Sequence, residues 1–272
     1  MDIMFDFTDR TVVVFGGTSG INYAIAEAFG RRGARVAVAS RKQDNVDAAL
    51  ERLRRLGITA AGFMADVRDV AAVEAAFESV ATSWGPIDVL VSGAAGNFLA
   101  EANQLSANGF KAVVDIDLLG TFHVMRQGFS RLASGASVIN ITAPQADIPM
   151  RYQAHVCAAK AGVDQLTRVL ALEWGAHGIR VNAISPGPIE GTEGLARLSP
   201  AGDPAGSTVL KFAPLGRLGT KQDVAQLAMF LASSAAGYIS GAVIPCDGGG
   251  AIDSVKPGIE EAGRAMARLS FR

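Results

Sequence analysis

The sequence is poor in charge, cysteine and histidine. Of its 272 residues, 19% are charged, two are cysteines and three are histidines. Cys157 and Cys246 lie far apart and in no metal-ligand spacing, which predicts a reduced compartment, no structural disulfide and no metal site. The formal net charge of −1 gives the chain no general attraction for nucleic acid or for an anionic membrane surface.

Long apolar runs and address signals are also missing. No apolar stretch reaches the roughly 18 residues of a membrane span. The N-terminal sequence MDIMFDFTDR carries acids and no long apolar run, unlike a signal peptide. The last residues, Leu269 to Arg272, form no peroxisomal tripeptide. We therefore expect a cytoplasmic protein with no membrane and no nucleic-acid partner.

The residues that are present favour one α/β domain over 1–272. The chain is 49% hydrophobic, which is enough to bury a large core. Short β-branched runs alternate with longer amphipathic stretches, which predicts a doubly wound parallel sheet of seven strands with helices on both faces. The runs are apolar nearly throughout, as expected of strands covered on both sides. The predicted strands are Thr11–Phe15, Arg35–Ala39, Gly62–Ala65, Val89–Ser92, Ser137–Ile141, Arg180–Ile184 and Ala242–Pro245. Helical spacing recurs at Ile21, Ala24, Ile25, Ala28 and Phe29, and again at Phe110, Val113, Val114 and Asp117.

Two segments depart from this alternation. Residues 187–214 are dense in Gly and Pro, and a loop of that length inside a compact domain predicts a substrate lid. The tail 251–272 is polar with a short helical pattern over Ile259–Leu269. It is a candidate for packing on a neighbouring subunit.

The first predicted strand leads directly into a glycine-rich turn. Gly16-Gly17-Thr18-Ser19-Gly20-Ile21 connects it to the first helix, and in this strand–turn–helix position glycines allow the backbone to approach a pyrophosphate. A tight turn without a ligand is the alternative. The pattern predicts a Rossmann dinucleotide site. Its first contacts would be Gly16, Thr18, Ser19, Gly20 and Ile21.

The cofactor's ribose has a basic partner in the sequence. About twenty residues after the turn, where an NAD enzyme carries an acid, the chain reads Ala39-Ser40-Arg41-Lys42. A guanidinium and an ammonium suit a 2′-phosphate. An ordinary solvated basic turn is the alternative. We predict that Ser40, Arg41 and Lys42 bind NADPH.

Two spacings resemble signatures of the short-chain dehydrogenase/reductase family. Gly16-x-x-x-Gly20-Ile21 resembles its glycine fingerprint, with Asn22 in place of the usual third glycine. The run from Val156 to Lys160 resembles its Tyr-x-x-x-Lys motif, with valine in the tyrosine's place. The resemblance implies further cofactor contacts, Lys160 among them. They are Asp66, Val67, Ala94, Ala95, Gly96, Lys160, Pro186, Gly187, Ile189 and Thr192.

The rest of that family's active site is replaced. Its usual Asn, Ser and Tyr fall on Asp117, Ala143 and Val156, and only Lys160 is retained. Carbonyl reduction needs a hydroxyl donor at the developing alkoxide. Reduction of a conjugated thioester does not, because charge spreads to an enolate oxygen while carbon is protonated through water. Asp117 near Lys160 could position that water. We predict these two residues as the catalytic pair.

Longer motifs resemble the 2,4-dienoyl-CoA reductases, most closely their peroxisomal branch, from Thr11 to Gly249. The most specific are Ala94-Ala95-Gly96-Asn97-Phe98 and Pro186-Gly187-Pro188-Ile189-Glu190-Gly191-Thr192-Glu193-Gly194-Leu195. The mitochondrial branch's tyrosine and asparagine fall at Gln145 and Leu119, which favours the branch whose site is built on Asp117 and Lys160.

The resemblance implies NADPH-dependent reduction of 2,4-dienoyl-CoA in auxiliary β-oxidation by a homotetramer. It also implies substrate contacts at Arg68, Asn97, Phe98, Ser106, His155 and Arg197. His155 could donate to the thioester oxygen or the ribose, or cap the helix that carries Lys160. Two other functions stay open: reduction of another activated alkene or carbonyl, and non-catalytic nucleotide binding.

Overall fold

The structure, a computed structural model, describes residues 5–198 and 213–252. Its sheet is parallel, with the order β3-β2-β1-β4-β5-β6-β7. The strands are β1 (Thr11–Phe15), β2 (Arg35–Ser40), β3 (Ala60–Met64), β4 (Ile87–Ser92), β5 (Leu132–Ile141), β6 (Arg180–Pro186) and β7 (Val243–Cys246). All seven predicted strands are confirmed. β3, β4 and β5 begin earlier than the apolar pattern indicates.

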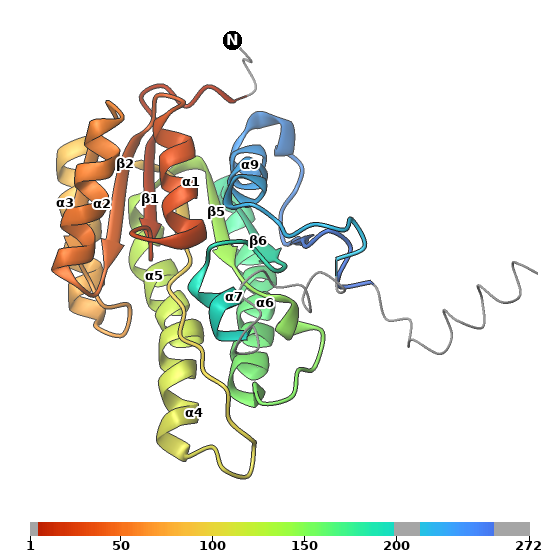
Figure 1. The fold of residues 1–272 in the computed structure, drawn as a ribbon. Helices are drawn as coiled ribbons and strands as arrows, with labels where there is room; N and C mark the ends of the chain where they lie inside the picture. Colours follow the sequence, from red (N-terminus) through yellow and green to blue (C-terminus); the bar gives the residue numbers. More distant parts are fainter. Residues whose placement is uncertain (1–4, 199–212, 253–272) are drawn as a thin grey trace, which may run out of the picture.

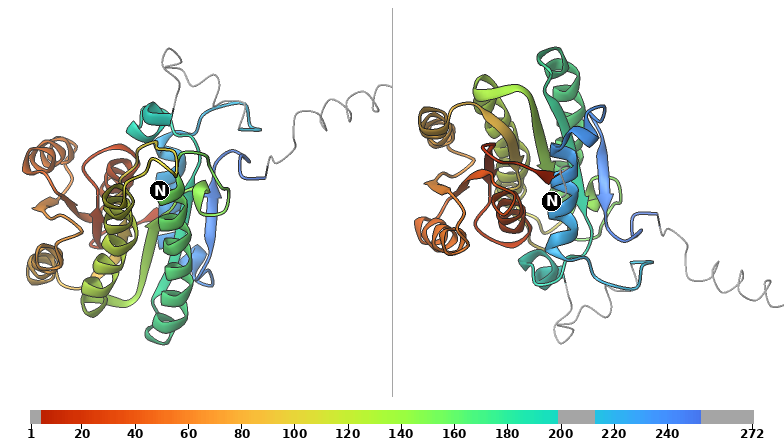
Figure 2. Two further views of the ribbon diagram at one scale, coloured as in Figure 1. Left: turned by 90° about the horizontal axis from the view of Figure 1, so that it is seen from below. Right: turned by 90° about the horizontal axis from the view of Figure 1, so that it is seen from above.

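Helices cover both faces of the sheet, as predicted (Figures 1 and 2). One layer holds α1 (Gly20–Gly30), α2 (Gln43–Arg55) and α9 (Lys221–Ala232). The opposite layer holds α3 (Val70–Trp84), α5 (Gly120–Gly128) and α6 (Ala154–Trp174). Two shorter helices, α4 (Ala107–Val114) and α7 (Glu193–Leu198), lie beyond the carboxyl ends of the strands.

The central strand shows why the apolar runs form a sheet with two cores. Side chains alternate between the faces of a strand, so Val12 and Val14 join the core under α1 and α9. Val13 and Phe15 point the other way, and the Phe15 ring lies 5.2 Å from that of Phe77 on α3. Each such buried side chain stabilises the fold by about 1.5–3 kcal/mol.

The helical pattern predicted from Phe110 to Asp117 is interrupted in the structure. α4 ends at Val114, and a π-helical turn over Asp115–Leu119 joins it to α5. Such turns are inserted into α-helices most often at functional sites. This one carries Asp117, whose side chain is buried.

The predicted lid over 187–214 is only partly described. Its first part follows β6, makes an isolated parallel bridge between Ile189 and Gly219, and continues into α7. Residues 199–212, and nearly all of the predicted tail 251–272, lie outside the described residues. Within the described ranges, no helix is long and apolar enough to cross a membrane.

Candidate active site

A cavity of about 1260 Å³ lies at the carboxyl ends of the strands. Loops that follow all seven strands form its walls. Between β1 and β4 the strand order reverses direction, and ligands of open α/β sheets bind at such a switch point. Every predicted cofactor-binding residue lines this cavity. The sequence therefore located the walls correctly, while the role of each residue stays a prediction.

The glycine-rich turn fits a dinucleotide. Gly16 has φ +77°, and a Cβ atom there would lie 2.9 Å from the backbone nitrogen of Ala94. Ser19 precedes α1 and makes no capping hydrogen bond with its side chain. The helix N-terminus thus keeps its backbone N–H groups for an anion, which is the geometry that binds pyrophosphate.

Asn22 supports this turn in a way the sequence did not reveal. Its side-chain Nδ2 donates a hydrogen bond of 2.7 Å to the carbonyl oxygen of Gly93. The amide therefore ties α1 to the loop that follows β4. The replacement of the family's third glycine was the only signal in the sequence, and it did not specify this bond.

The far end of the cavity carries the basic pair. Arg41 and Lys42 line the cavity and are exposed, so both can reach a phosphate. Asp66 lines the same corner and accepts two hydrogen bonds from the Arg68 guanidinium, at 2.9 Å and 2.5 Å. These bonds hold the pKa of Asp66 below its ordinary value. Arg68, predicted to touch the substrate, pairs with Asp66 two residues away in this structure, and its substrate contact stays a prediction.

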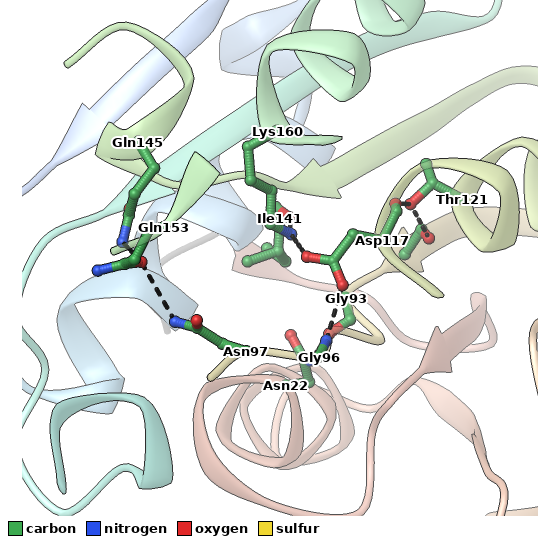
Figure 3. Close-up of polar contacts among 11 residues, drawn as sticks. Asn22, Gly93, Gly96, Asn97, Asp117, Thr121, Ile141, Gln145, Gln153 and Lys160 are labelled. Atoms are coloured by element: carbon green, nitrogen blue, oxygen red, sulfur yellow. Dashed lines mark hydrogen bonds and ion pairs between the residues drawn. The ribbon is translucent and has the colours of Figure 1, made fainter. Parts of the chain in front are cut away.

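The centre of the site is a buried ion pair between Lys160 and Asp117 (Figure 3). Lys160 Nζ lies 3.2 Å from Asp117 Oδ2 and donates to the carbonyl oxygen of Ile141 at 3.1 Å. The other carboxylate oxygen accepts the Gly96 N–H at 2.7 Å. Only 5% of Lys160 and 1% of Asp117 are exposed. A buried charge requires a partner of this kind.

Local structure explains the position of Asp117. The π-helical turn places its side chain toward the loop after β4, while its backbone oxygen accepts a hydrogen bond of 2.7 Å from Thr121 Oγ1. Lys160 comes from a different element, α6, and its side chain points toward the Asp117 carboxylate (Figure 3). The pair thus joins two elements, and both of its side chains border the cavity.

The two positions that lost hydroxyl groups face the same cavity. Val156 precedes Lys160 by one helical turn, and both line the cavity, as does Ala143. Val156 is buried and packs with Val113 and Ala159. The two residues predicted to replace the family's tyrosine and serine thus form an apolar part of the cavity wall.

Amide side chains line the cavity near these positions. Gln145 Nε2 donates to Gln153 Oε1 at 3.0 Å, and Asn97 Nδ2 donates to the same oxygen at 3.4 Å (Figure 3). The sequence predicted Asn97 as a site residue but not the two glutamines. Little in the sequence indicated the two glutamines, since each is a single polar residue in an irregular stretch.

Three further predicted substrate residues, Phe98, His155 and Ser106, are not among the described residues that line the cavity. Phe98 packs edge-on against His155, with ring centroids 4.4 Å apart. His155 is fully buried, neither ring nitrogen has a hydrogen-bond partner among the described residues, and burial lowers its pKa. It does not cap α6, whose cap position is Gln153. Ser106 caps α4 by accepting the Gly109 N–H at 3.0 Å. Arg197 belongs to α7, and its side chain is outside what the structure describes.

Metal chemistry has no visible support in the described ranges. They contain no group of three or more His, Cys, Asp or Glu side chains placed to hold an ion. The groups that the described residues place at the cavity are an ion pair, amide donors and a glycine-rich turn that fits a dinucleotide.

Comparisons with known proteins agree with this site. A family model described as enoyl-(acyl carrier protein) reductase matches residues 16–250. The peroxisomal 2,4-dienoyl-CoA reductase [(3E)-enoyl-CoA-producing] of Rattus norvegicus is 44% identical over 89% of this chain and 83% of its own length. A probable 2,4-dienoyl-CoA reductase [(2E)-enoyl-CoA-producing] of Bacillus subtilis is 38% identical over 88% of this chain and 96% of its own.

Solved structures share the fold over nearly the whole chain. A short chain dehydrogenase from Bacillus anthracis superposes with a TM-score of 0.83 at 35% identity, covering 91% of this chain and 98% of that one. A putative gluconate dehydrogenase from Agrobacterium tumefaciens has a TM-score of 0.87 at 28% identity, with coverage of 94% and 100%.

Proposed function

We propose, on the premise that this chain belongs to the short-chain dehydrogenase/reductase family, that it reduces 2,4-dienoyl-CoA thioesters to enoyl-CoA in auxiliary fatty-acid β-oxidation. Relatives that carry this activity in their names share about two-fifths of its residues over most of the chain. The observation that supports the proposal most strongly is the Lys160–Asp117 pair beside an apolar wall at the lost hydroxyl positions.

The cofactor of this reaction is NADPH. Family membership implies a nicotinamide dinucleotide, which supplies a hydride when bound. The turn from Gly16 to Ile21 would hold the pyrophosphate. Arg41 and Lys42, both exposed at the cavity edge, would bind the 2′-phosphate, since no acid takes the place that NAD enzymes use. Lys160 would hold the nicotinamide ribose.

The reaction centre is the ion pair. Hydride addition to a conjugated thioester moves charge onto the thioester oxygen, and the resulting enolate takes a proton at carbon. Asp117 would order and recharge the water that delivers this proton, while the Lys160 ammonium stabilises the negative charge. Asp117 is suited to this role because the Gly96 N–H fixes one carboxylate oxygen, while the other faces the Lys160 ammonium and has no hydrogen-bond partner among the described residues.

Two alternatives are less well supported. A carbonyl reductase needs a hydroxyl donor, and Ala143 and Val156 put apolar groups where the family carries Ser and Tyr. A non-catalytic nucleotide-binding protein would have no use for a buried ion pair beside its cavity. A buried pair contributes little net stability, so its presence favours a chemical role.

The assembly is a homotetramer in the cytoplasm. Apolar side chains that are exposed in the single chain, Phe122 on α5 with Val169 and Leu172 on α6, support burial against other copies. Light scattering of the purified protein tests this, and a monomer would contradict it.

The test of the function is a comparison of two substrates. NADPH oxidation is followed with a 2,4-dienoyl-CoA and with a 3-oxoacyl-CoA of equal chain length. We expect turnover with the first and at least a hundredfold lower kcat/KM with the second. The reverse preference, or tight NADPH binding with no turnover on either, would reject the proposal.

A further inference from the structure

Three buried or half-buried amide side chains meet in the cavity from three different elements. Gln145 lies in a short 3₁₀ turn after β5, Gln153 immediately precedes α6, and Asn97 lies in the loop after β4. We call these three residues the amide cluster. Only 7% of Gln145 and 4% of Gln153 are exposed. Burying flexible polar side chains costs free energy, so the burial of these amides needs a structural or a functional explanation.

A structural role in capping α6 does not explain the burial of Gln153. Gln153 occupies the cap position of α6, yet its side chain makes no capping hydrogen bond. Its amide oxygen accepts from both Gln145 and Asn97, which fixes the plane of the carboxamide. No described residue accepts a hydrogen bond from Gln153 Nε2, and this nitrogen is not among the fully buried unpaired atoms. The cluster therefore holds in place the amide of Gln153, a residue that lines the cavity, and leaves its N–H₂ group without an acceptor among the described residues.

The amide cluster is connected to the ion pair. Gly96 donates its N–H to Asp117, and the next residue, Asn97, donates to Gln153 (Figure 3). A continuous polar line thus runs from Lys160 through Asp117 and the loop after β4 to the two glutamines. The rest of this wall, at Ala143 and Val156, offers no donor from its side chains.

We propose that Gln153 donates its amide N–H to the thioester oxygen of the acyl-CoA substrate, with Gln145 and Asn97 as positioning residues. This inference rests on the proposed function. Hydride adds to the remote alkene carbon, the conjugated electrons move to the thioester oxygen, and the carbonyl re-forms when a water proton adds to carbon. The oxygen gains negative charge but need not be protonated. A fixed neutral amide meets that need, and a donor aimed at developing charge is worth about 10²–10³ in kcat.

The experiment compares the Gln153→Leu variant with the wild type. We expect kcat for a 2,4-dienoyl-CoA to fall about 10²-fold, as for the loss of one oxyanion donor, with the Kd of NADPH changed less than twofold. Gln145→Leu leaves the donor in place but loosens it, so its loss of kcat should be smaller. Gln165→Leu, at an exposed glutamine on α6, the helix that Gln153 precedes, is the matched control and should behave as wild type.

A second readout isolates the thioester oxygen. Inhibition constants are measured for a saturated acyl-CoA and for its S-alkyl thioether, which lacks the carbonyl. The wild type should bind the thioester roughly fivefold more tightly, the worth of one hydrogen bond of about 1 kcal/mol. Gln153→Leu should bind both alike, and a merely structural defect would weaken both equally while keeping the ratio.

The outcomes separate this inference from the proposed function. If the wild type reduces dienoyl-CoA and Gln153→Leu keeps both kcat and the thioester preference, the inference is wrong and the function stands. If the wild type reduces no dienoyl-CoA, the function fails. The inhibition constants then still report whether Gln153 recognises the carbonyl.

Discussion

The two ends of the cavity are built by different means. At the cofactor end, the predicted contacts come from backbone in the Gly16 turn and from the exposed side chains of Arg41 and Lys42. At the reaction end, they come from buried side chains, with Asp117 and Lys160 joined at 3.2 Å. The first end retains what the family uses to hold a dinucleotide. The second has exchanged hydroxyl donors for an ion pair, so cofactor binding and choice of reaction are separable within one fold.

The largest expected effect is at Lys160, which belongs to both ends. Lys160→Met keeps the length of the side chain but removes the ammonium, so kcat should fall at least about 10³-fold and NADPH affinity should fall as well. The buried Asp117 loses its partner, which should lower the free energy of unfolding by about 3–5 kcal/mol. Steady-state kinetics, NADPH titration and urea unfolding measure these three changes.

Lys111→Met is the control for Lys160→Met. Lys111 is an exposed lysine on α4, and it pairs with Asp115 at the start of the π-helical turn. Its loss should leave all three quantities nearly unchanged. If Lys160→Met retained NADPH affinity and kcat, the two ends of the cavity would not meet at this residue.

The next effect belongs to the cofactor end alone. Arg41→Asp places a carboxylate beside the 2′-phosphate, so the Kd of NADPH should rise about 10²-fold, while the Kd of NADH changes by less than about threefold. Fluorescence titration with both cofactors measures the difference. Arg55→Asp, the same charge change on the exposed side of α2, is the control. Equal losses for both cofactors would mean that Arg41 does not bind the phosphate.

A smaller effect on turnover is expected from a substitution at the reaction end of the cavity. Val156→Tyr restores the family's phenol at a buried site packed against Val113 and Ala159. Because the larger ring occupies space needed by the acyl chain or water, dienoyl-CoA turnover should fall severalfold, and 3-oxoacyl-CoA reduction should not appear. A large gain in 3-oxoacyl reduction would reveal a carbonyl reductase disabled by one residue.

The smallest effect is a pH dependence of stability. Burial lowers the pKa of His155, so below the ordinary value of about 6.5 the unfolded chain binds a proton that the folded chain resists. Stability is therefore lost as pH falls from about 6.5 toward the lowered pKa. His155→Leu should reduce the loss of unfolding free energy between pH 7.5 and pH 5.5 by about 1 kcal/mol. His177→Leu, at an exposed position, should leave this loss of unfolding free energy unchanged.

The sequence predicted the strands and the cavity walls because both depend on local patterns. Continuous apolar runs mark buried strands, and the glycine-rich turn has a distinctive order. The π-helical turn was not predictable, because the helical spacing from Phe110 continues to Asp117 without a break. Gln145 and Gln153 meet only through the tertiary fold. The pairing of Arg68 with Asp66 carries no sequence signature either.

The central claim is that a carboxylate at the asparagine position of the family carries out the proton chemistry. Asp117→Asn tests it most directly, since it keeps the shape and restores the family's usual residue. The measurement is kcat for a 2,4-dienoyl-CoA together with the Kd of NADPH. We expect kcat to fall about 10²–10⁴-fold, with NADPH binding nearly unchanged. Full turnover by Asp117→Asn would contradict it.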